Sequence, residues 1–384
     1  MEKTRICLFT AHSPQMGGGA VILRSLIANL PRLSVAWFYI GDETVSGYES
    51  GYLGKGFMGG AIAADIFNTW KMLTNRKVAY IDAIVKQLLQ IECDKYWIVS
   101  HNEGLRIALE LARIQSKPVH LSVHDDWAGA ICARSIRYKF LAVWAKKLTI
   151  STLKAVSSVD VISSAMADYY KQIAGVKSEV CHRYLNEKMI RHTDDITKAE
   201  QSTITCGHIG SIYNKTDFIA FLTIFHEFVT DKGKKPMMKM WGCHLTVDDI
   251  PPQLRDNINF YPTLPEEEVI PKLATCTFVY AMYPFNKALS LFSATSLPTK
   301  LTSYLQAGRP TFGHGPEKST LATFLTANKL GTMWTSLNKE EGLKDMTAIL
   351  SATITYQQLN DARKHYFGER NLIIMNQALL DNPD

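Results

Sequence analysis

One stretch near the C-terminal end decides the fold class: Ser296-Leu297-Pro298-Thr299-Lys300-Leu301-Thr302-Ser303-Tyr304-Leu305-Gln306-Ala307-Gly308-Arg309-Pro310-Thr311-Phe312. Pro298 suits the first turn of a helix, where its missing N–H removes no bond. Apolar residues then recur at helical spacing, and Gly308 is suited to end the helix. Pro310 blocks further helix, and the strand that starts at Thr311 runs into glycines. A short helix that leads into such a strand is one unit of an open α/β sheet, where ligands bind at the carboxyl ends of strands.

Length and composition describe a globular protein of ordinary character. The chain has 384 residues, which is too long for one typical hydrophobic core and predicts two domains. Hydrophobic residues make up 46% of the sequence and charged residues 20%, which excludes a disordered or fibrous chain. The net charge of +6 is compatible with anionic substrates or an anionic membrane surface, and we expect no nucleic-acid partner.

The cysteines and the N-terminus favour a reduced, cytoplasmic protein. The seven cysteines are scattered, and none has the spacing of a zinc site or a disulfide framework. We therefore expect reduced thiols and no metal. The first residues lead directly into a strand without a signal-peptide core, and no apolar run reaches the about 18 residues of a membrane span.

The opening stretch resembles a known motif. The segment SLPTKLTSYLQAGRPTFGHGP, followed by STLATFL, is similar to the C-terminal-domain motif of GT-B-fold glycosyltransferases, especially the bacterial family 4-like enzymes (glycosyl transferases group 1). The usual form is Pro-x-Lys-Leu-x-Glu-Tyr-x-Ala-x-Gly-x-Pro. Where the family carries a Glu that binds the ribose hydroxyls of the nucleotide, this chain has Ser303, which lacks the charge and the bidentate reach of a carboxylate.

The resemblance implies an α/β protein with the GT-B fold, in which two Rossmann-like domains face each other across a cleft. A polar stretch over 186–202 separates two α/β patterns and is expected to be the linker. Residues 1–185 would then form the N-terminal, acceptor-binding domain, and 203–356 the C-terminal domain that binds the nucleotide-sugar. Residues 357–384 would form a C-terminal helix that packs back on the N-terminal domain.

The first strand leads into a glycine loop. Arg5 to Thr10 is an apolar strand, the loop that follows ends in Gly17-Gly18-Gly19, and a periodic helix runs from Ala20 to Leu30. This order aims backbone N–H groups and a helix N-terminus at an anion. It is not a GxGxxG fingerprint, so dinucleotide binding is weakly indicated. We expect Gly18 and Gly19 to bind the donor; the alternative is a tight turn with no ligand.

Polar groups end several strands of the N-terminal half. The strand over 94–100 is followed by His101-Asn102, and the strand over 118–123 by His124-Asp125-Asp126. The carboxyl ends of parallel strands share one edge, so these side chains should converge with His12. We expect catalytic roles for His12, His124 and Asp125, and acceptor binding by His101, Asn102 and Asp126. An inverting reaction needs a base among them, whereas a retaining one, which the resemblance implies, does not.

The second half supplies the predicted donor site. After a strand over 203–208 the family pattern is Gly-Arg-Leu followed by Lys. Here Ser211 stands in the position of the arginine and Lys215 replaces the lysine. Positive charge and N–H dipoles are needed where the nucleotide diphosphate leaves. The donor, a UDP- or GDP-sugar, is expected to contact Gly210, Ser211, Lys215, Lys300, Ser303 and Gly315.

A basic stretch over 134–147, from Arg134 to Lys147, is interleaved with aromatic residues. One interpretation is a patch that docks on anionic lipid to reach a lipid-linked acceptor. The other is an ordinary helix with one face in the core and a solvated basic side. We also expect a glycine-rich loop over 41–60, and a helix over 165–173 that is capped by Ser164.

These features together predict a metal-independent glycosyltransferase of the hexosyltransferase class. It would move a sugar from a nucleotide-sugar to a glycan, a lipid-linked molecule or another acceptor in polysaccharide or glycoconjugate biosynthesis. The expected place is the cytoplasm, with the inner face of the membrane as a variant. Two alternatives share the fold: a non-catalytic sugar- or nucleotide-binding protein, which the loss of the Glu and the Arg favours, and a sugar-nucleotide epimerase.

Overall fold

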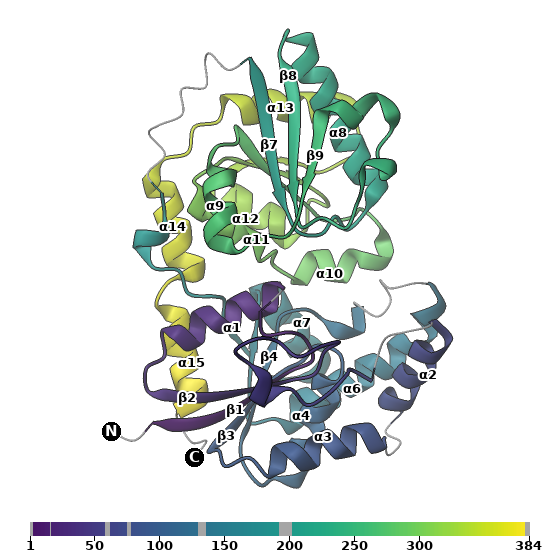
Figure 1. Cartoon of the computed structure of the whole chain (residues 1–384), viewed down its shortest axis with the longest axis vertical. Coiled ribbons are helices and arrows are strands. Elements are labelled where there is room, and N and C mark those ends of the chain that lie inside the picture. The colour runs from purple at the N-terminus through teal and green to yellow at the C-terminus, as the bar shows by residue number, and fades with distance from the viewer. Residues whose placement is uncertain are drawn as a thin grey trace. The chain divides into compact units, whose positions relative to one another are not determined.

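The computed structural model describes residues 3–15, 17–57, 62–74, 78–129, 136–191 and 202–380. The chain divides into two compact units (Figure 1). The N-terminal unit comprises Met1–Tyr184, Ala294–Ser296 and Glu369–Asp384, and the C-terminal unit comprises Leu185–Ser293 and Leu297–Gly368. Residues 192–201 of the predicted linker and Arg134, where the predicted basic stretch starts, lie outside the described residues, as do 58–60 of the predicted glycine-rich loop.

The N-terminal unit is built on a parallel sheet. In the described part of the chain this sheet has six strands in the order β2-β1-β3-β4-β5-β6. The strands are β1 (Thr4–Thr10), β2 (Leu33–Tyr39), β3 (Lys95–Val99), β4 (Val119–Val123), β5 (Ser158–Val161) and β6 (Glu179–Val180). The segments between and after them form α1 (Gly18–Ala28), η1 (Glu49–Gly51), α2 (Ile62–Leu73), α3 (Ala79–Leu89), α4 (Gly104–Ile114), η2 (Ile136–Leu141), α6 (Ala142–Ala155), α7 (Ser164–Ala174) and α15 (Arg370–Leu380).

The C-terminal unit repeats this plan with another strand order. Its described strands form one parallel sheet in the order β12-β11-β10-β7-β8-β9. They are β7 (Thr203–Ile209), β8 (Lys235–Trp241), β9 (Ile258–Tyr261), β10 (Phe278–Met282), β11 (Thr311–His314) and β12 (Gly331–Trp334). Its helices are η3 (Glu187–Met189), α8 (Lys215–Asp231), η4 (Val247–Asp249), η5 (Pro252–Asn257), α9 (Glu266–Ala274), η6 (Lys287–Leu289), α10 (Ser290–Thr295), α11 (Lys300–Ala307), α12 (Thr320–Asn328), α13 (Lys339–Ser351) and α14 (Tyr356–Phe367).

Each sheet has one point where the strand order reverses. In the N-terminal sheet β1 lies between β2 and β3, so consecutive connections leave it in opposite directions. In the C-terminal sheet β7 lies between β8 and β10. Parallel α/β sheets leave a crevice at the carboxyl ends of such strand pairs, because the helices that follow cover opposite faces. The prediction of two Rossmann-like α/β domains is confirmed.

The opening motif folds as its sequence indicates. α11 ends at Gly308, which adopts the left-handed conformation with φ 65° and donates its N–H to Tyr304 O and Leu305 O. The chain then turns into β11, which pairs in parallel with β10 and β12. The motif therefore places the first turn of α11 next to the strands that flank the reversal point.

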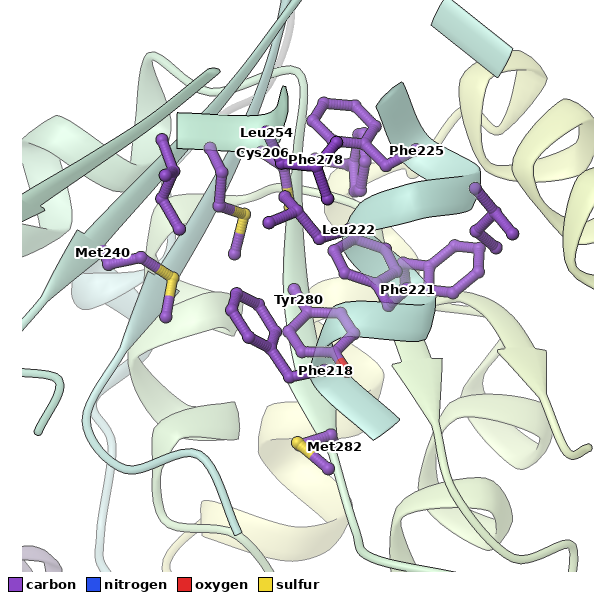
Figure 2. Close-up of a cluster of buried hydrophobic side chains, with 14 of the residues drawn as sticks. Cys206, Phe218, Phe221, Leu222, Phe225, Met240, Leu254, Phe278, Tyr280 and Met282 are labelled. Carbon is purple, nitrogen blue, oxygen red and sulfur yellow. The ribbon is translucent and has the colours of Figure 1, made fainter. Parts of the chain in front are cut away.

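Aromatic side chains of α8 form the core of the C-terminal unit (Figure 2). Phe221 stacks on Tyr280 of β10 with ring centroids 3.9 Å apart, and it also contacts Phe225 and Phe312. Phe218 packs beside the same rings at the start of the helix. These contacts pack α8 against the middle of the sheet. They also set the position at which the helix begins, close to the carboxyl end of β7.

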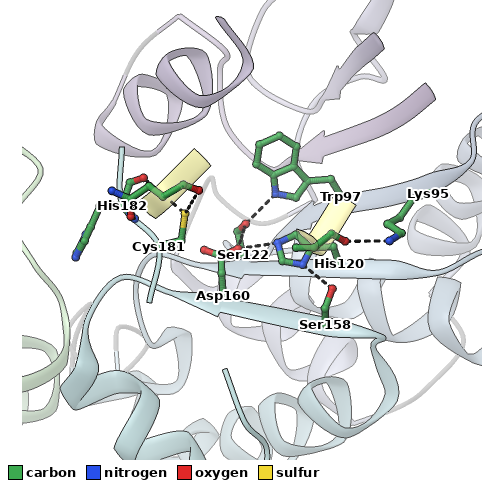
Figure 3. Close-up of polar contacts among 10 residues, drawn as sticks. Lys95, Trp97, His120, Ser122, Ser158, Asp160, Cys181 and His182 are labelled. Atoms are coloured by element: carbon green, nitrogen blue, oxygen red, sulfur yellow. Dashed lines mark hydrogen bonds and ion pairs between the residues drawn. The ribbon is translucent and has the colours of Figure 1, made fainter. Parts of the chain in front are cut away.

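A buried polar network joins three strands of the N-terminal sheet (Figure 3). His120 on β4 lies between Asp160 (Nε2 to Oδ1, 2.8 Å) and Ser158 (Nδ1 to Oγ, 2.8 Å) on β5. Ser122 Oγ donates to the same Asp160 oxygen and accepts the indole N–H of Trp97 from β3 at 2.8 Å. The network satisfies its polar atoms internally, as buried polar groups require.

The C-terminal residues form two helices where one was expected over 357–380. α14 ends before Gly368, whose extended backbone (φ −84°, ψ −168°) interrupts the helix. Only α15 belongs to the N-terminal unit. There Lys95 Nζ donates to Ala378 O at 2.9 Å, and Asn371 Oδ1 accepts the N–H of His182 at 2.8 Å. A Cβ atom at Gly368 would lie 2.5 Å from Lys364 O, so close backbone packing explains the glycine at this break.

Two local predictions need correction. The cap of α7 is Ser163 and not Ser164, because Ser163 Oγ accepts the N–H of Met166 while Ser164 is already helical. The basic stretch is not one helix over 134–147: its described part is the 3₁₀ segment η2 followed by α6, which continues to Ala155. Within the described ranges, no helix is long and apolar enough to cross a membrane.

Phe221→Ala tests the core. The substitution removes a ring that is fully buried and stacked on Tyr280. We expect it to lower the unfolding free energy of the C-terminal unit by about 3–5 kcal/mol, because the cavity collapses only in part. Urea unfolding followed by circular dichroism measures the change. Leu337→Ala, at a side chain that is 52% exposed, is the control and should change stability by less than about 0.5 kcal/mol. Equal effects would contradict the assigned core.

Candidate functional site

Three histidines gather at the reversal point of the N-terminal sheet. His12 follows β1 and His101 follows β3, and their rings meet edge to face with centroids 6.0 Å apart. Gly19, in the first turn of α1, separates His12 from His124. A Cβ atom at Gly19 would lie 3.2 Å from His12 Nε2 and 3.1 Å from His124 Nδ1. A glycine is needed here because a side chain would press on both rings.

The environment keeps the imidazoles of His12 and His124 neutral. Burial lowers the pKa of His12, against a hydrogen-bonding contact of its Nδ1 with Ser13 O at 3.0 Å. Burial lowers the pKa of His124 to about 4, opposed by the charge of Asp160 and reinforced by His12. Both rings are therefore uncharged at neutral pH, each with one nitrogen that accepts and one that donates.

The carboxylate pair after β4 divides into two environments. Asp125 Oδ1 accepts the hydroxyl of Ser296 at 2.7 Å, and burial raises the pKa of Asp125 to about 6. Asp126 is 2% exposed. Its two oxygens accept the N–H of Gly129 at 2.7 Å and the hydroxyl of Tyr170 at 3.0 Å. Asp126 therefore holds the loop together, and Asp125 is the carboxylate with a pKa closer to neutrality.

The predicted acceptor residues of the β3 end differ in exposure. His101 is exposed, whereas Asn102 is partly buried and has a left-handed backbone with φ 45°. Asn102 Oδ1 accepts the indole N–H of Trp127 at 3.4 Å. The structure therefore brings together all the predicted N-terminal site residues, but Asp126 and Asn102 contact protein groups that fix the loops.

Lys300 is the centre of the corresponding edge in the C-terminal unit. The chain leaves β7 through Gly210, which has φ 76° and donates its N–H to Trp241 O at 2.8 Å. Lys300 is the first residue of α11. Its Nζ donates to Ser211 O at 3.1 Å, lies 3.4 Å from His208 Nε2 and stands 5.7 Å from the ring centroid of Tyr213.

The charge of Lys300 is not neutralised by a carboxylate among the described residues. Burial lowers the pKa of Lys300 to about 7. His208 cannot share the charge, because burial and the nearby Lys300 lower the pKa of His208 well below its usual range. His208 Nδ1 lies 2.9 Å from Tyr280 O, and its Nε2 lies 3.2 Å from Gly210 O and 3.4 Å from Lys300 Nζ. A cation in this setting gains by binding an anion.

The second predicted lysine has a different setting. Lys215 begins α8 after the cap Asn214, whose side chain accepts the N–H of Asp217. Lys215 Nζ pairs with Asp249 Oδ1 at 2.9 Å, and this pairing lowers the pKa of Asp249 to about 2. The charge of Lys215 is thus compensated within the protein, whereas that of Lys300 is not.

A carboxylate lies next to Ser303. Its hydroxyl donates to Glu266 Oε1 at 2.7 Å, and Gln306 Nε2 approaches the same oxygen at 3.4 Å. Glu266 is the first residue of α9 and comes from a distant part of the sequence. The sequence analysis missed this role for it; its only signal was the run of three glutamates after Pro265, which suits a helix N-terminus by itself.

Aromatic residues surround the Lys300 edge, and they were also missed. Tyr213 stacks on Tyr283 with centroids 5.8 Å apart, and both contact Phe292. Asp217 Oδ2 accepts the N–H of Phe285 at 3.0 Å and holds the loop after β10 against α8. The predicted residue Gly315 meets this loop too: a Cβ there would lie 2.8 Å from Tyr283 O, so close backbone packing explains the glycine.

Neither edge contains a recognisable metal site. In the residues that the structure describes, no group of three or more His, Cys, Asp or Glu side chains could hold a metal ion.

The comparisons with known proteins identify the fold. No family model matches the sequence, and no curated protein matches it. Solved structures match over nearly the whole chain. AviGT4, a glycosyltransferase involved in avilamycin A biosynthesis, has a TM-score of 0.56 and 13% identity over 99% of both chains. An α-glucosyltransferase solved with UDP and a 13-mer DNA containing an HMU base has a TM-score of 0.60 and 13% identity over 99% of this chain and 100% of that one.

A third similar structure is an α,α-trehalose-phosphate synthase (UDP-forming) from Burkholderia xenovorans, solved in complex with glucose-6-phosphate. Its TM-score is 0.64 at 11% identity, and the match covers 98% of this chain and 100% of that one. At these identities the likeness concerns the fold. The chain has the fold of GT-B glycosyltransferases, as the motif around Lys300 predicts.

Two groups of the N-terminal edge should give opposite pH dependences of stability. The folded-state pKa of Asp125 is about 6, above its ordinary value of 3.8, so its contribution to stability is present at low pH and is lost as pH rises through about 6. The pKa of His124 is lowered from 6.5 to about 4, so its contribution is present above 6.5 and is lost as pH falls through about 4.

We therefore expect the melting temperature of Asp125→Asn, relative to wild type, to rise between pH 4 and pH 6.5. For His124→Gln the relative melting temperature should fall over the same interval. Differential scanning calorimetry at half-unit steps of pH measures both, and each variant serves as the control for the other. Parallel curves would contradict the assigned environments.

Proposed function

We propose that this GT-B-fold chain is a glycosyltransferase that moves a sugar from a nucleoside-diphosphate sugar to an acceptor. The observation that carries the proposal is Lys300. It is a partly buried cation without a carboxylate partner among the described residues, and it lies at the carboxyl edge where the C-terminal sheet reverses. Such a position attracts an anionic ligand, and a diphosphate is the anion that a sugar donor releases.

In this proposal Lys300 stabilises the departing diphosphate. Negative charge develops on the oxygen that leaves the sugar, and a fixed cation in a partly dry site stabilises it more than a cation in water would. The chain at Gly210 and Ser211 lies beside the ammonium group and is expected to approach the phosphates. Lys215 is expected to contribute less, because Asp249 already pairs with it.

The N-terminal unit is proposed to hold the acceptor at the His12, His101 and His124 edge. Asp125 is ionised in most molecules at neutral pH and has a raised pKa, so it can accept a proton from an acceptor hydroxyl if the reaction inverts the anomeric centre. If the reaction retains it, as the resemblance implies, Asp125 and the neutral histidines orient the acceptor by hydrogen bonds.

We further propose that Glu266 contacts the ribose of the donor. The resemblance implies a carboxylate on the ribose hydroxyls at the position of Ser303, and the hydroxyl of Ser303 donates to Glu266. Glu266 belongs to α9, and its carboxylate can accept hydrogen bonds from the two ribose hydroxyls. A glutamate at position 303 of α11 would accept the same bonds. The substitution at 303 would then change the source of the carboxylate and keep its chemistry.

UDP is the first nucleotide to test. The α-glucosyltransferase among the similar structures was solved with UDP, and the trehalose-phosphate synthase is described as UDP-forming. We propose a UDP-sugar ahead of a GDP-sugar for this reason, and a glycan or a lipid-linked molecule as acceptor. We place the reaction in the cytoplasm; the free, buried thiols of Cys7, Cys181 and Cys206 accord with a reducing compartment.

Removing the Lys300 charge should abolish most of the diphosphate affinity. Lys300→Ala is expected to weaken binding by roughly 10- to 100-fold, since a charge-assisted hydrogen bond is lost. Thermal-shift titrations with UDP, GDP, ADP, CMP and dTDP measure this, because a ligand of the folded state raises the midpoint. Lys344→Ala, on the exposed side of α13, is the matched control.

The outcomes separate the proposal from its alternatives. Stabilisation by one diphosphate, lost in Lys300→Ala only, supports the donor site. Release of that diphosphate from its sugar conjugate in the presence of acceptor supports transfer. Binding without any consumption of nucleotide-sugar favours a non-catalytic binding protein, and interconversion of the sugar without transfer favours an epimerase. If no nucleotide raises the melting midpoint at millimolar concentration, the proposed donor site is contradicted.

The proposed ribose contact predicts a specific loss of selectivity. Wild type should bind UDP about tenfold more tightly than 2′-deoxy-UDP, and Glu266→Gln should reduce this ratio to about one, since the charged acceptor is gone. Isothermal titration calorimetry gives both dissociation constants for each protein. Glu268→Gln, two residues further into the same helix and exposed, is the control. A ratio that survives in Glu266→Gln would contradict the contact.

A further inference from the structure

Helix α2 exposes large apolar side chains. Its buried residues are Asp65, Thr69, Met72 and Leu73, whereas Ile62 and Phe67 have 53% and 50% of their surface accessible. Large apolar side chains that gather on the surface indicate a contact other than with water.

A buried hydrogen bond joins α2 to the neighbouring segment. Tyr138 of η2 donates its hydroxyl to Asp65 Oδ2, and Tyr138 is itself 5% exposed. α2 also contacts η2 and α6, as Figure 1 shows for α2 and α6. The residues exposed on α2 therefore adjoin those exposed on the basic segment.

The segment that α2 contacts exposes apolar residues too. Phe140, Val143 and Trp144 are 54%, 62% and 37% exposed, and the rings of Phe140 and Trp144 meet edge to face at 6.5 Å. We call the exposed residues of the two elements the basic–apolar face. Its members are Ile62, Phe67, Lys139, Phe140, Val143, Trp144, Lys146 and Lys147, and the half-buried Lys71 borders it.

The charges of this face have one sign. The sequence from Ile136 to Ala155 contains no Asp or Glu, and the lysines of α6 at 146 and 147 are exposed. Lys71 lies 4.3 Å from the ring centroid of Phe67, so a cation also borders the apolar residues of α2. The acidic residue of α2, Asp65, is buried and accepts from Tyr138.

We propose that the basic–apolar face docks on an anionic phospholipid surface. Insertion of aromatic and aliphatic side chains at the headgroup boundary, together with lysines that meet lipid phosphates, is the composition of interfacial membrane binding. Long lysine side chains can reach the headgroups while their stems cover apolar surface. This proposal takes up the lipid-patch interpretation of the basic stretch and extends it to α2. The other interpretation accounts for the core-facing side of α6, which buries Ala145, Leu148 and Leu153, but not for the exposed Phe140, Val143 and Trp144.

The face and the proposed acceptor edge belong to the same unit. Thr152 Oγ1 of α6 donates to Leu105 O at 3.2 Å, at the start of the helix that follows His101 and Asn102. Docking would therefore hold the unit that carries the His12 and His124 edge at the headgroups. The docking itself does not depend on the proposed sugar transfer, and the two can fail separately.

Vesicle flotation of the full chain tests the docking. Wild type should float with vesicles of phosphatidylcholine containing about one third phosphatidylglycerol, and weakly with phosphatidylcholine alone. Each exposed cation near the surface contributes about fivefold to the partition coefficient. We therefore expect Lys139→Glu/Lys146→Glu/Lys147→Glu to lower it more than about 100-fold. Phe67→Ser/Phe140→Ser/Trp144→Ser should bind less than wild type at every lipid composition.

Matched variants elsewhere in the N-terminal unit separate the face from general charge or hydrophobicity. Lys86→Glu on α3 and Ile114→Ser, which is 50% exposed, should float as wild type does. Raising the salt from about 0.1 M to about 0.5 M should weaken wild-type binding, since the Debye length shortens. Melting temperatures and UDP shifts of all variants show whether the fold and the donor site persist.

Three results would overturn the docking. They are absence of wild-type flotation with anionic vesicles, equal flotation with neutral and anionic vesicles, and equal flotation of the face and control variants. Concentration-dependent dimerisation without vesicle binding, lost in the Phe67→Ser variant, would assign the face to a second copy of this chain. If UDP does not raise the melting temperature of the wild type while the wild type floats normally with anionic vesicles, the proposed function is contradicted and the docking is not.

Discussion

Parallel strand pairing is the constraint on which the rest of this structure depends. Parallel neighbours cannot be joined by a tight turn, so a crossover segment follows each strand and every carboxyl end lies at the same edge. In the N-terminal sheet the reversal at β1 places His12 beside His101. In the C-terminal sheet the reversal at β7 places Gly210 and Ser211 beside the loop after β10. Two separate sets of polar groups follow from one rule of chain geometry.

The difference between Lys215 and Lys300 shows what the surroundings add to a motif. Both lysines start helices in the C-terminal unit, and both match the family's basic positions. An exposed pair such as Lys215 with Asp249 is worth little to stability and also occupies the cation. Lys300 instead contacts a carbonyl oxygen and a neutral imidazole, neither of which carries a charge that cancels its own. Its affinity for an anion therefore remains available.

The sequence predicted features that depend on local chemistry. The helix end at Gly308 and the polar residues that follow the strands each rest on a few adjacent residues, and both have the expected form. Contacts between distant segments could not be predicted. The bond from Ser303 to Glu266 joins two helices, and the burial of Asp65 depends on Tyr138. The single C-terminal helix was wrong for a local reason, because one glycine in an otherwise helical pattern was not read as a break.

Because the pKa of Lys300 is low, the binding of an anion is coupled to the uptake of protons. A group with a pKa of about 7 is charged in only part of the molecules at neutral pH. An anion placed beside it favours the charged form and raises that pKa, so the protein takes up a fraction of a proton from the buffer as the anion binds. The heat of binding will then include the ionisation heat of whichever buffer is present. The affinity for the anion will also fall at alkaline pH, because a smaller fraction of Lys300 is then protonated before the anion binds.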